Sequence, residues 1–179
     1  MTAVRGKRDE NRDESKEAHV AGRAGLATVA ADVPFFSSQW AARVAAAVET
    51  GLAPETRAPK LGTYWEWVDR ARARYHGSWA IGVRNPPDGE PSWLVLDWSA
   101  GQCTGARITG AQGAASADFQ VSADSEDWRG LLDGYDPGRA VMDRKLVMER
   151  GRVLDFFSIV YFFIEVVRCL ASVPASLPA

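Results

Sequence analysis

Residues 117–151 constrain the fold more than any other segment, because they pack two short strands and two short helices into 35 residues. Phe119 and Val121 share one face of a strand over 117–122, and apolar residues at helical spacing predict a helix over 126–133. Elements this short can bury their apolar side chains only against other elements. The segment therefore predicts an α+β fold in which strands and helices share one core.

Capping residues indicate where these elements begin and end. Ser125 is expected to cap the first helix, and Asp136 with Pro137 is expected to start the second. An apolar run over 146–148 then predicts the last strand.

The preceding segment adds three strands. Alternating apolar side chains predict strands over 78–84, 92–98 and 102–109, joined by short turns. Links this short leave no room for a crossover helix, so the three strands are expected to form an antiparallel meander. The small residues 110–116 are interpreted as a loop. The five strands together predict a mainly antiparallel sheet.

Two helices are predicted before the sheet. A Ser cap ahead of Trp40 and a stop at Gly51 define the first helix. Thr63 and Glu66 fit a capping box at the start of the second. The second helix is expected to have an apolar face of Tyr64, Trp67, Val68, Ala71 and Tyr75, and a solvated face with Arg70, Arg72 and Arg74.

The last predicted helix, over 153–171, is apolar on nearly every side. Asp155, Glu165 and Arg168 interrupt it, and its 19 residues only just reach membrane-spanning length. Such a helix fills a core, lines a cavity or lies on a membrane surface. We expect core packing and cavity lining first, with transient membrane-surface contact as the minor alternative.

The chain totals exclude some classes of protein. A length of 179 residues suits one domain with tails, and a net charge of −2 provides no basic field to attract nucleic acid. Residues 1–33 are interpreted as a disordered charged tail and linker, 34–173 as one domain, and 174–179 as a short C-terminal tail. The two cysteines form no framework and no apolar leader is visible, which predicts a cytoplasmic location.

Several runs of residues match the pattern of a known family. They are the strand, glycine turn and strand over 96–103, Ala117-Asp118-Phe119, Trp128 to Leu132 followed by Gly134, and Pro137 to Met142. In these runs the chain resembles the sterol carrier protein 2 (SCP2) family. The resemblance extends over about residues 35–171 and is that of a divergent, bacterial-type stand-alone member. It departs from the pattern at Arg144, where the family usually has a glycine that permits a tight turn or close approach.

The resemblance implies a binding fold: a five-stranded, mainly antiparallel sheet with helices packed on one face around an apolar cavity. It implies non-catalytic binding or transfer of a hydrophobic small molecule, which could be a lipid, sterol-like, fatty acyl or polyketide-like compound. It brings no catalytic residue, cofactor or metal.

The walls of such a cavity are expected to come from the meander, the strand after it and the helices, with ordinary core packing as the alternative role for the same side chains. The candidate ligand-binding residues are Trp79, Ile81, Val83, Leu94, Leu96, Trp98, Phe119, Val121, Trp128, Leu132, Phe157, Val160, Tyr161 and Ile164.

The sequence offers little chemistry beyond binding. Its two histidines and two separate cysteines give no metal-ligand spacing, and His76 is interpreted as a helix-end residue. An isomerase or cyclase using the same cavity is the alternative, with Asp97, Arg107 or Tyr161 as its polar residue. A further alternative is a docking module whose final helix forms a homodimer or holds a partner enzyme.

Overall fold

The computed structural model describes residues 33–86 and 89–177. The chain divides into two compact units, Met1–Ala30 and Ala31–Ala179, and all described residues belong to the second. Of the tail and linker predicted for residues 1–33, residues 1–32 lie outside the described residues, and Val33 belongs to the short strand β1 (Val33–Pro34).

A five-stranded sheet forms the centre of this unit, in the order β4-β3-β2-β5-β6. Strands β2, β3 and β4 form the expected antiparallel meander, and β5 pairs antiparallel with β6. Within this sheet, of the strands that the structure describes, only β2 and β5 pair in parallel, so the prediction of a mainly antiparallel sheet is confirmed. The strands are β2 (Gly77–Val83), β3 (Ser92–Ser99), β4 (Gln102–Thr109), β5 (Phe119–Ala123) and β6 (Val147–Arg150).

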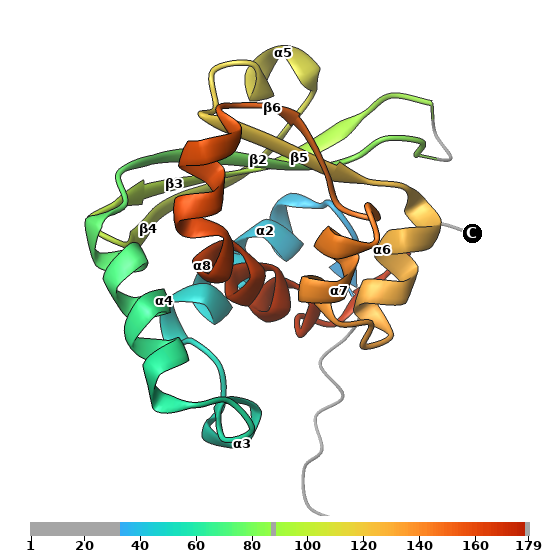
Figure 1. The fold of residues 1–179 in the computed structure, drawn as a ribbon. Coiled ribbons are helices and arrows are strands. Elements are labelled where there is room, and N and C mark those ends of the chain that lie inside the picture. The colour runs from blue at the N-terminus through green and yellow to red at the C-terminus, as the bar shows by residue number, and fades with distance from the viewer. Residues whose placement is uncertain (1–32, 87–88, 178–179) are drawn as a thin grey trace, which may run out of the picture. The chain divides into compact units, whose positions relative to one another are not determined.

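Helices cover one face of the sheet, as Figure 1 shows. The longest, α8, coincides with the predicted 153–171, and the short α3 (Pro54–Arg57) precedes α4. The helices on this face are α2 (Ser38–Thr50), α4 (Gly62–Arg74), α6 (Ser125–Leu132), α7 (Pro137–Met142) and α8 (Val153–Ala171).

The interpretation of residues 110–116 as a plain loop was wrong, because they contain a one-turn helix, α5 (Ala111–Ala114), on the opposite face of the sheet (Figure 1). Ala114 packs there with Trp93 and Val95 of β3 in a second, smaller apolar cluster. A one-turn helix of small residues leaves no 3.6-residue apolar period, so the sequence pattern did not indicate it.

The main core lies between the sheet and α8. Trp79 of β2 packs against Trp98 of β3 with ring centroids 4.9 Å apart. Phe162 of α8 contacts both rings, at 4.9 and 5.0 Å. These tilted and edge-to-face contacts lock α8 against the meander and bury most of its C-terminal half.

Two of the predicted helix caps are confirmed. The Ser37 hydroxyl accepts a hydrogen bond from the backbone N–H of Trp40 at 3.1 Å, and the Asp136 carboxylate accepts one from Arg139 N–H at 2.9 Å. Each bond satisfies a backbone donor that has no partner within its helix.

The other two caps were wrong. Helix α4 begins two residues earlier than expected, so Leu61 occupies the cap position and Thr63 lies inside the first turn. Helix α6 begins at Ser125, with Asp124 before it, but the carboxylate of Asp124 accepts bonds from Arg84 and Asn85 instead of capping. Because the Asp124 carboxylate pairs with Arg84, it does not cap the first turn of α6.

The backbone at Arg144 explains the glycine of the family pattern. Arg144 has a φ of 58°, in the left-handed region where glycine is free of strain and a side chain is not. The chain thus keeps the turn that follows α7 while carrying a residue poorly suited to it.

The two ends of the described chain meet in a separate small sheet. Strand β1 (Val33–Pro34) pairs in parallel with β7 (Ala175–Ser176), and the N–H of Phe35 donates to the carbonyl of Ser176 at 2.9 Å. Neither strand was predicted, since two residues carry no period.

Candidate ligand-binding groove

Helices α4 and α8 lie side by side (Figure 1). Two adjoining cavities, lined by these helices and the turn before α4, form what we call the α4–α8 groove. The first has a volume of about 530 Å³ and the second about 490 Å³. The first is lined by Trp67, Arg70, Ala71, Arg74, Tyr75, Phe157, Ser158, Ile159 and Tyr161, and the second by Pro59, Lys60, Leu61, Thr63, Tyr64, Trp67 and Tyr161.

Trp67 and Tyr161 are the two side chains shared by both cavities. Their ring centroids are 6.2 Å apart, and Tyr161 also meets the ring of Tyr64 at 5.3 Å. Trp67 is 58% exposed and Tyr161 is 43% exposed, so neither is held by a packed core. The two rings therefore form the partition between the cavities.

Local helix geometry places these rings in the groove. Val68 is the buried residue of α4, so the adjacent Trp67 is turned about 100° away from the core. On α8, Phe156 and Ile159 are buried, which directs Phe157 and Tyr161 outward. An apolar helix thus presents its N-terminal half to the groove and its C-terminal half to the core.

An ionic network centred on the buried Glu165 lies beside the second cavity, which Lys60 and Tyr64 line. Glu165 is only 5% exposed, and its Oε1 accepts hydrogen bonds from Lys60 and, at 2.6 Å, from the Tyr64 hydroxyl. Its Oε2 accepts from Arg168 Nε at 3.2 Å, and Arg168 also donates to Asp136 at 2.7 Å. The network ties the turn before α4 to α8 and to the cap of α7.

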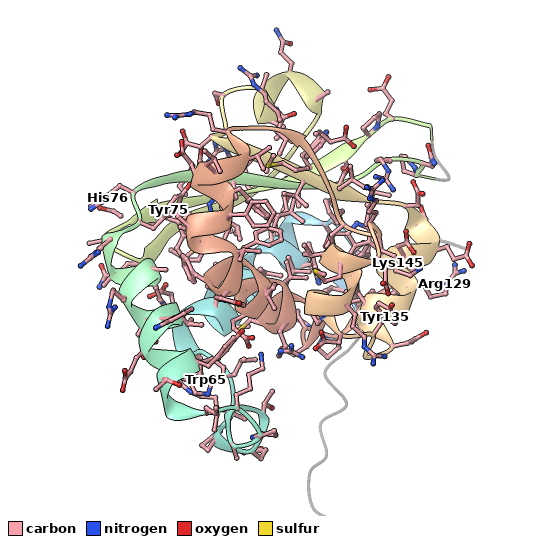
Figure 2. All side chains as sticks on the ribbon, viewed as in Figure 1. Trp65, Tyr75, His76, Arg129, Tyr135 and Lys145 are labelled. Carbon is pink, nitrogen blue, oxygen red and sulfur yellow. The ribbon has the colours of Figure 1, made fainter. Side chains whose placement is uncertain are left out.

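Two of the three tyrosines that line the cavities, Tyr64 and Tyr75, stay protonated and donate hydrogen bonds. Burial, the bond to Glu165 and its charge raise the pKa of Tyr64 well above its ordinary value. Burial and the nearby Asp118 likewise raise the pKa of Tyr75, whose hydroxyl donates to Asp118 at 3.5 Å. Tyr75 lies at the end of α4 (Figure 2) and lines the first cavity, so that cavity has an uncharged phenol ring at its edge.

Of the fourteen residues predicted to bind ligand, Phe157 and Tyr161 line the groove. Leu132 and Val160 are half-buried. The other ten form part of the buried interior: Trp79, Ile81, Val83, Leu94, Leu96, Trp98, Phe119, Val121, Trp128 and Ile164.

The polar residues named for an enzyme are not assembled in one place. Asp97 and Arg107 pair with each other on β3 and β4, whereas Tyr161 lies in the groove on α8. His76 follows the end of α4 (Figure 2), and its Nδ1 accepts a bond from Ala100 N–H at 3.2 Å. Within residues 33–86 and 89–177 no three His, Cys, Asp or Glu side chains form a group that could hold a metal ion.

The sequence analysis did not assign the α4 side of the groove. Trp67 was placed on an apolar face expected to be buried, and Arg70 and Arg74 were interpreted only as solvated. The missed signal was the i, i+3, i+7 spacing of Trp67, Arg70 and Arg74, which sets all three on one face of α4. That face meets α8 only in the folded chain.

Among the helices that the structure describes, none combines the length and the apolar character that crossing a membrane requires. The final helix fails this criterion, as its interrupting charges suggest.

Comparisons with known proteins agree on one family. A model described as the SCP-2 sterol transfer family matches residues 61–149, from the turn before α4 into β6. A crystal structure of sterol carrier protein 2 is 25% identical, with a TM-score of 0.61 over 78% of this chain and 98% of that one. A conserved hypothetical protein of Thermus thermophilus, described as possibly a sterol carrier protein, is also 25% identical, with a TM-score of 0.58 over 82% and 94%. No curated protein matches the chain. The fold, the matched residues and these relatives together place the chain in the SCP-2 sterol transfer family.

Proposed function

We propose that the α4–α8 groove binds a hydrophobic small molecule, which the protein carries without covalent chemistry. The observation that carries this proposal is the set of exposed aromatic walls, Trp67, Phe157 and Tyr161, around two cavities of ligand size. Apolar side chains left in contact with water at a concave site favour the burial of an apolar ligand.

The polar groups of the groove are few and lie at its edges. Arg70, Arg74 and Tyr75 line the first cavity, and Lys60 and Tyr64 line the second. A site of this kind holds the apolar body of a ligand by burial and orients it through a small number of hydrogen bonds. The proposed ligand classes are lipids and sterol-like, fatty acyl or polyketide-like compounds, and the sterol carrier name of the relatives supports them.

Two sequence predictions become part of this proposal. Residues 34–173 are proposed as the lipid-binding domain, supported by the family match to 61–149. A cytoplasmic location is proposed, supported by the free thiols of Cys103 and Cys169. Ligand contact by the inner walls, and a homodimer or partner enzyme at the final helix, stay predictions.

The proposal is tested by titrating the full chain with a fluorescent fatty acid and by native mass spectrometry of the purified protein. We expect saturable binding, and about a tenfold weaker affinity for Phe157→Ser, which removes apolar contact area from the first cavity. Met142→Ser is the matched control, since Met142 is 82% exposed but lies on α7, outside both cavities.

Two results would contradict the proposal. A protein that is empty in the mass spectrometer and gives no saturable fluorescence change has no such function. Equal binding by Phe157→Ser and Met142→Ser would place the ligand elsewhere, and the inner walls would be the next place to test.

A further inference from the structure

The segment between α2 and α4 buries no side chain against the rest of the molecule. It contains the one-turn helix α3 and lies beyond the N-terminal end of α4, away from the sheet (Figure 1). None of residues 52–61 is buried, and only Leu52, Arg57 and Lys60 are half-buried. We call residues 52–61 the α3 flap. Because the flap gains little from apolar burial, side-chain bonds at a few points hold it in place.

A glycine stands at each end of the α3 flap. Gly51 ends α2 with a φ of 76°, which favours glycine, and Gly62 is the first residue of α4. A Cβ at Gly62 would meet no atom within 4 Å, and the φ of Gly62 lies outside the left-handed region. Neither packing nor backbone conformation therefore requires glycine at this second end. Glycines at the ends of two helices give the flap the backbone freedom of a hinged segment.

Arg57 attaches the α3 flap to α4. Its guanidinium carbon lies 4.2 Å from the centroid of the Trp65 ring, and its carbonyl accepts a hydrogen bond from Trp65 Nε1 at 3.1 Å. Its ion pair with Asp69, at 3.9 Å, joins two exposed side chains. Contacts of this kind at a surface are individually weak, so they restrain the flap without fixing it.

Lys60 attaches the α3 flap to α8. Its Nζ pairs with Oε1 of the buried Glu165 and donates to the Tyr64 hydroxyl at 3.1 Å. The same ammonium lies 4.3 Å from the centroid of the Tyr64 ring. A charge-assisted bond to a buried carboxylate is stronger than an ion pair in water, so Lys60 makes the firmer of the two attachments.

Glu165 keeps two other donors when Lys60 leaves it. The Tyr64 hydroxyl donates to Oε1 at 2.6 Å, and Arg168 Nε donates to Oε2 at 3.2 Å. The buried carboxylate would stay hydrogen-bonded and paired with a cation, while water would hydrate the Lys60 ammonium. The Lys60–Glu165 bond can therefore break and form again without leaving a buried charge unpaired.

The α3 flap forms one wall of the second cavity. Pro59, Lys60 and Leu61 line this cavity, and its other lining residues belong to α4 and α8. A further hollow, of about 50 Å³, has Arg57 and Glu165 among its lining residues. One partner of the Lys60–Glu165 bond lines each space, so the bond lies between the second cavity and this hollow.

We propose that the α3 flap is a hinged wall of the second cavity and that Lys60 latches it to Glu165. Release of Lys60 lets the flap move away from α8, which admits a ligand to this cavity or frees it. Lys60 is a positioning residue here, because its donors are used within the protein. The proposal rests on the proposed function in one respect, since it requires a ligand in the groove. The movement of the flap requires no ligand and is measured without one.

The first test is hydrogen–deuterium exchange of the ligand-free full chain, followed by mass spectrometry of peptides that cover residues 54–61. We expect about fivefold faster exchange in Lys60→Met, which keeps the apolar stem and loses the ammonium. Gly62→Ala should slow this exchange about threefold, because alanine restricts the hinge and fits there without a clash.

Two variants serve as matched controls. Lys145→Met removes another paired lysine, which bonds to Asp127 at 2.5 Å and lines neither cavity. Gly110→Ala changes a second glycine whose Cβ would meet no atom within 4 Å, next to α5 on the opposite face of the sheet. Both should leave the exchange of the flap as it is in the wild type. Far-UV circular dichroism checks that each variant keeps its fold.

The second test measures the rates of fluorescent fatty acid binding by stopped-flow fluorescence. A latch controls how often the cavity opens, so Lys60→Met should raise the association and dissociation rate constants together, by about fivefold, while Kd changes less than about twofold. Gly62→Ala should lower both rate constants by about threefold. A lysine that only contacted the ligand would change the dissociation rate constant alone.

Four outcomes would overturn the latch or its hinge. Unchanged exchange of residues 54–61 in Lys60→Met overturns the latch, as does an equal increase in Lys145→Met. A change in dissociation alone assigns Lys60 to ligand contact instead. Equal exchange in Gly62→Ala and Gly110→Ala removes the hinge from Gly62. Fatty acid binding with unchanged exchange contradicts the latch alone, whereas faster exchange in a protein that binds no fatty acid contradicts the proposed function alone.

Discussion

At the scale of single residues, the backbone of Arg144 has the left-handed conformation that the glycine of the family pattern would adopt without strain. Its φ of 58° imposes strain on any residue with a side chain, worth about 1–2 kcal/mol. We predict that Arg144→Gly raises the free energy of unfolding by roughly 0.5–1 kcal/mol, because the relief of strain exceeds the added freedom of the unfolded chain. Urea unfolding of both proteins measures the difference.

Arg129→Gly is the matched control for that substitution. Arg129 is an exposed arginine within α6, where glycine has no conformational advantage. It should lower the free energy of unfolding by about 1 kcal/mol. If Arg144→Gly behaves in the same way, the strain at Arg144 is not the dominant effect.

Glu165 is the residue whose loss should cost most stability among the charged groups of the groove. It is buried and accepts bonds from Lys60, Tyr64 and Arg168. Glu165→Ala leaves Arg168 and Lys60 without this counter-ion, and we predict a loss of about 2–4 kcal/mol in urea unfolding. Glu66→Ala, an exposed position on α4, should change stability by less than about 0.5 kcal/mol and serves as the control.

At the scale of elements, the two rings shared by the cavities would limit the length of a ligand bound as we propose. Trp67 and Tyr161 separate two spaces of similar volume, so a ligand in one meets a ring before it reaches the other. We predict that Tyr161→Ala joins the spaces and moves the best-bound member of an alkyl-chain series to longer chains. Displacement of a fluorescent fatty acid by saturated acids of increasing length measures this shift.

The same series of saturated acids, bound to a second variant at Tyr161, provides the control. Tyr161→Phe keeps the ring and should leave the length preference of the wild type in place. A length preference that is identical in Tyr161→Ala and the wild type means that the two rings do not limit the ligand.

Sequence patterns predicted which helices and strands form better than they predicted where each one ends or which elements pack beside it. The apolar run of α8 indicated its bounds correctly, because nineteen largely apolar residues between a Gly and a Pro leave few alternatives. The predicted caps at Thr63 and Ser125 were wrong because helix starts shift by one or two residues and because distant partners, such as Arg84 for Asp124, decide which side chain is available. A one-dimensional pattern holds no information about such partners.

The candidate site shows the same limit. Phe157 and Tyr161 were named from the sequence because α8 is too apolar to be only a surface helix. Trp67 was not named, since its role depends on α4 lying beside α8, and nothing local in either helix specifies that neighbour. The fold class followed from short elements and short links, whereas the groove is a product of tertiary packing.

At the scale of the whole molecule, the rate at which a reagent modifies the Cys169 thiol measures cooperative unfolding of the protein. It is buried on α8, and burial raises the pKa of its thiol from 9.0 to about 11. We predict that a thiol reagent modifies the half-buried Cys103 well before Cys169 at about pH 8. Modification of Cys169 should follow the rate of global unfolding, which mass spectrometry of labelled peptides measures.

The raised pKa of Cys169 also makes the free energy of unfolding fall at alkaline pH. The unfolded thiol ionises near pH 9 while the folded one stays protonated, so its contribution is complete below pH 9 and is lost as the pH rises towards about 11. Tyr64 and Tyr75, whose pKa values are raised from 10.0, add to the loss above pH 10. Urea unfolding of Cys169→Ala should show a flatter decline between about pH 9 and 10, and an unchanged slope would contradict this assignment.

The pairing of β1 with β7 has a mechanical consequence. These strands run in parallel, so the N-terminal end of β1 and the C-terminal end of β7 lie at opposite ends of the pair. A pull on the two ends of this unit would load the hydrogen bonds between the strands in shear, all at once, whereas an antiparallel pair would open one bond at a time. A force applied to both ends would therefore act first on the hydrogen bonds between β1 and β7, before it reaches α8 and the groove.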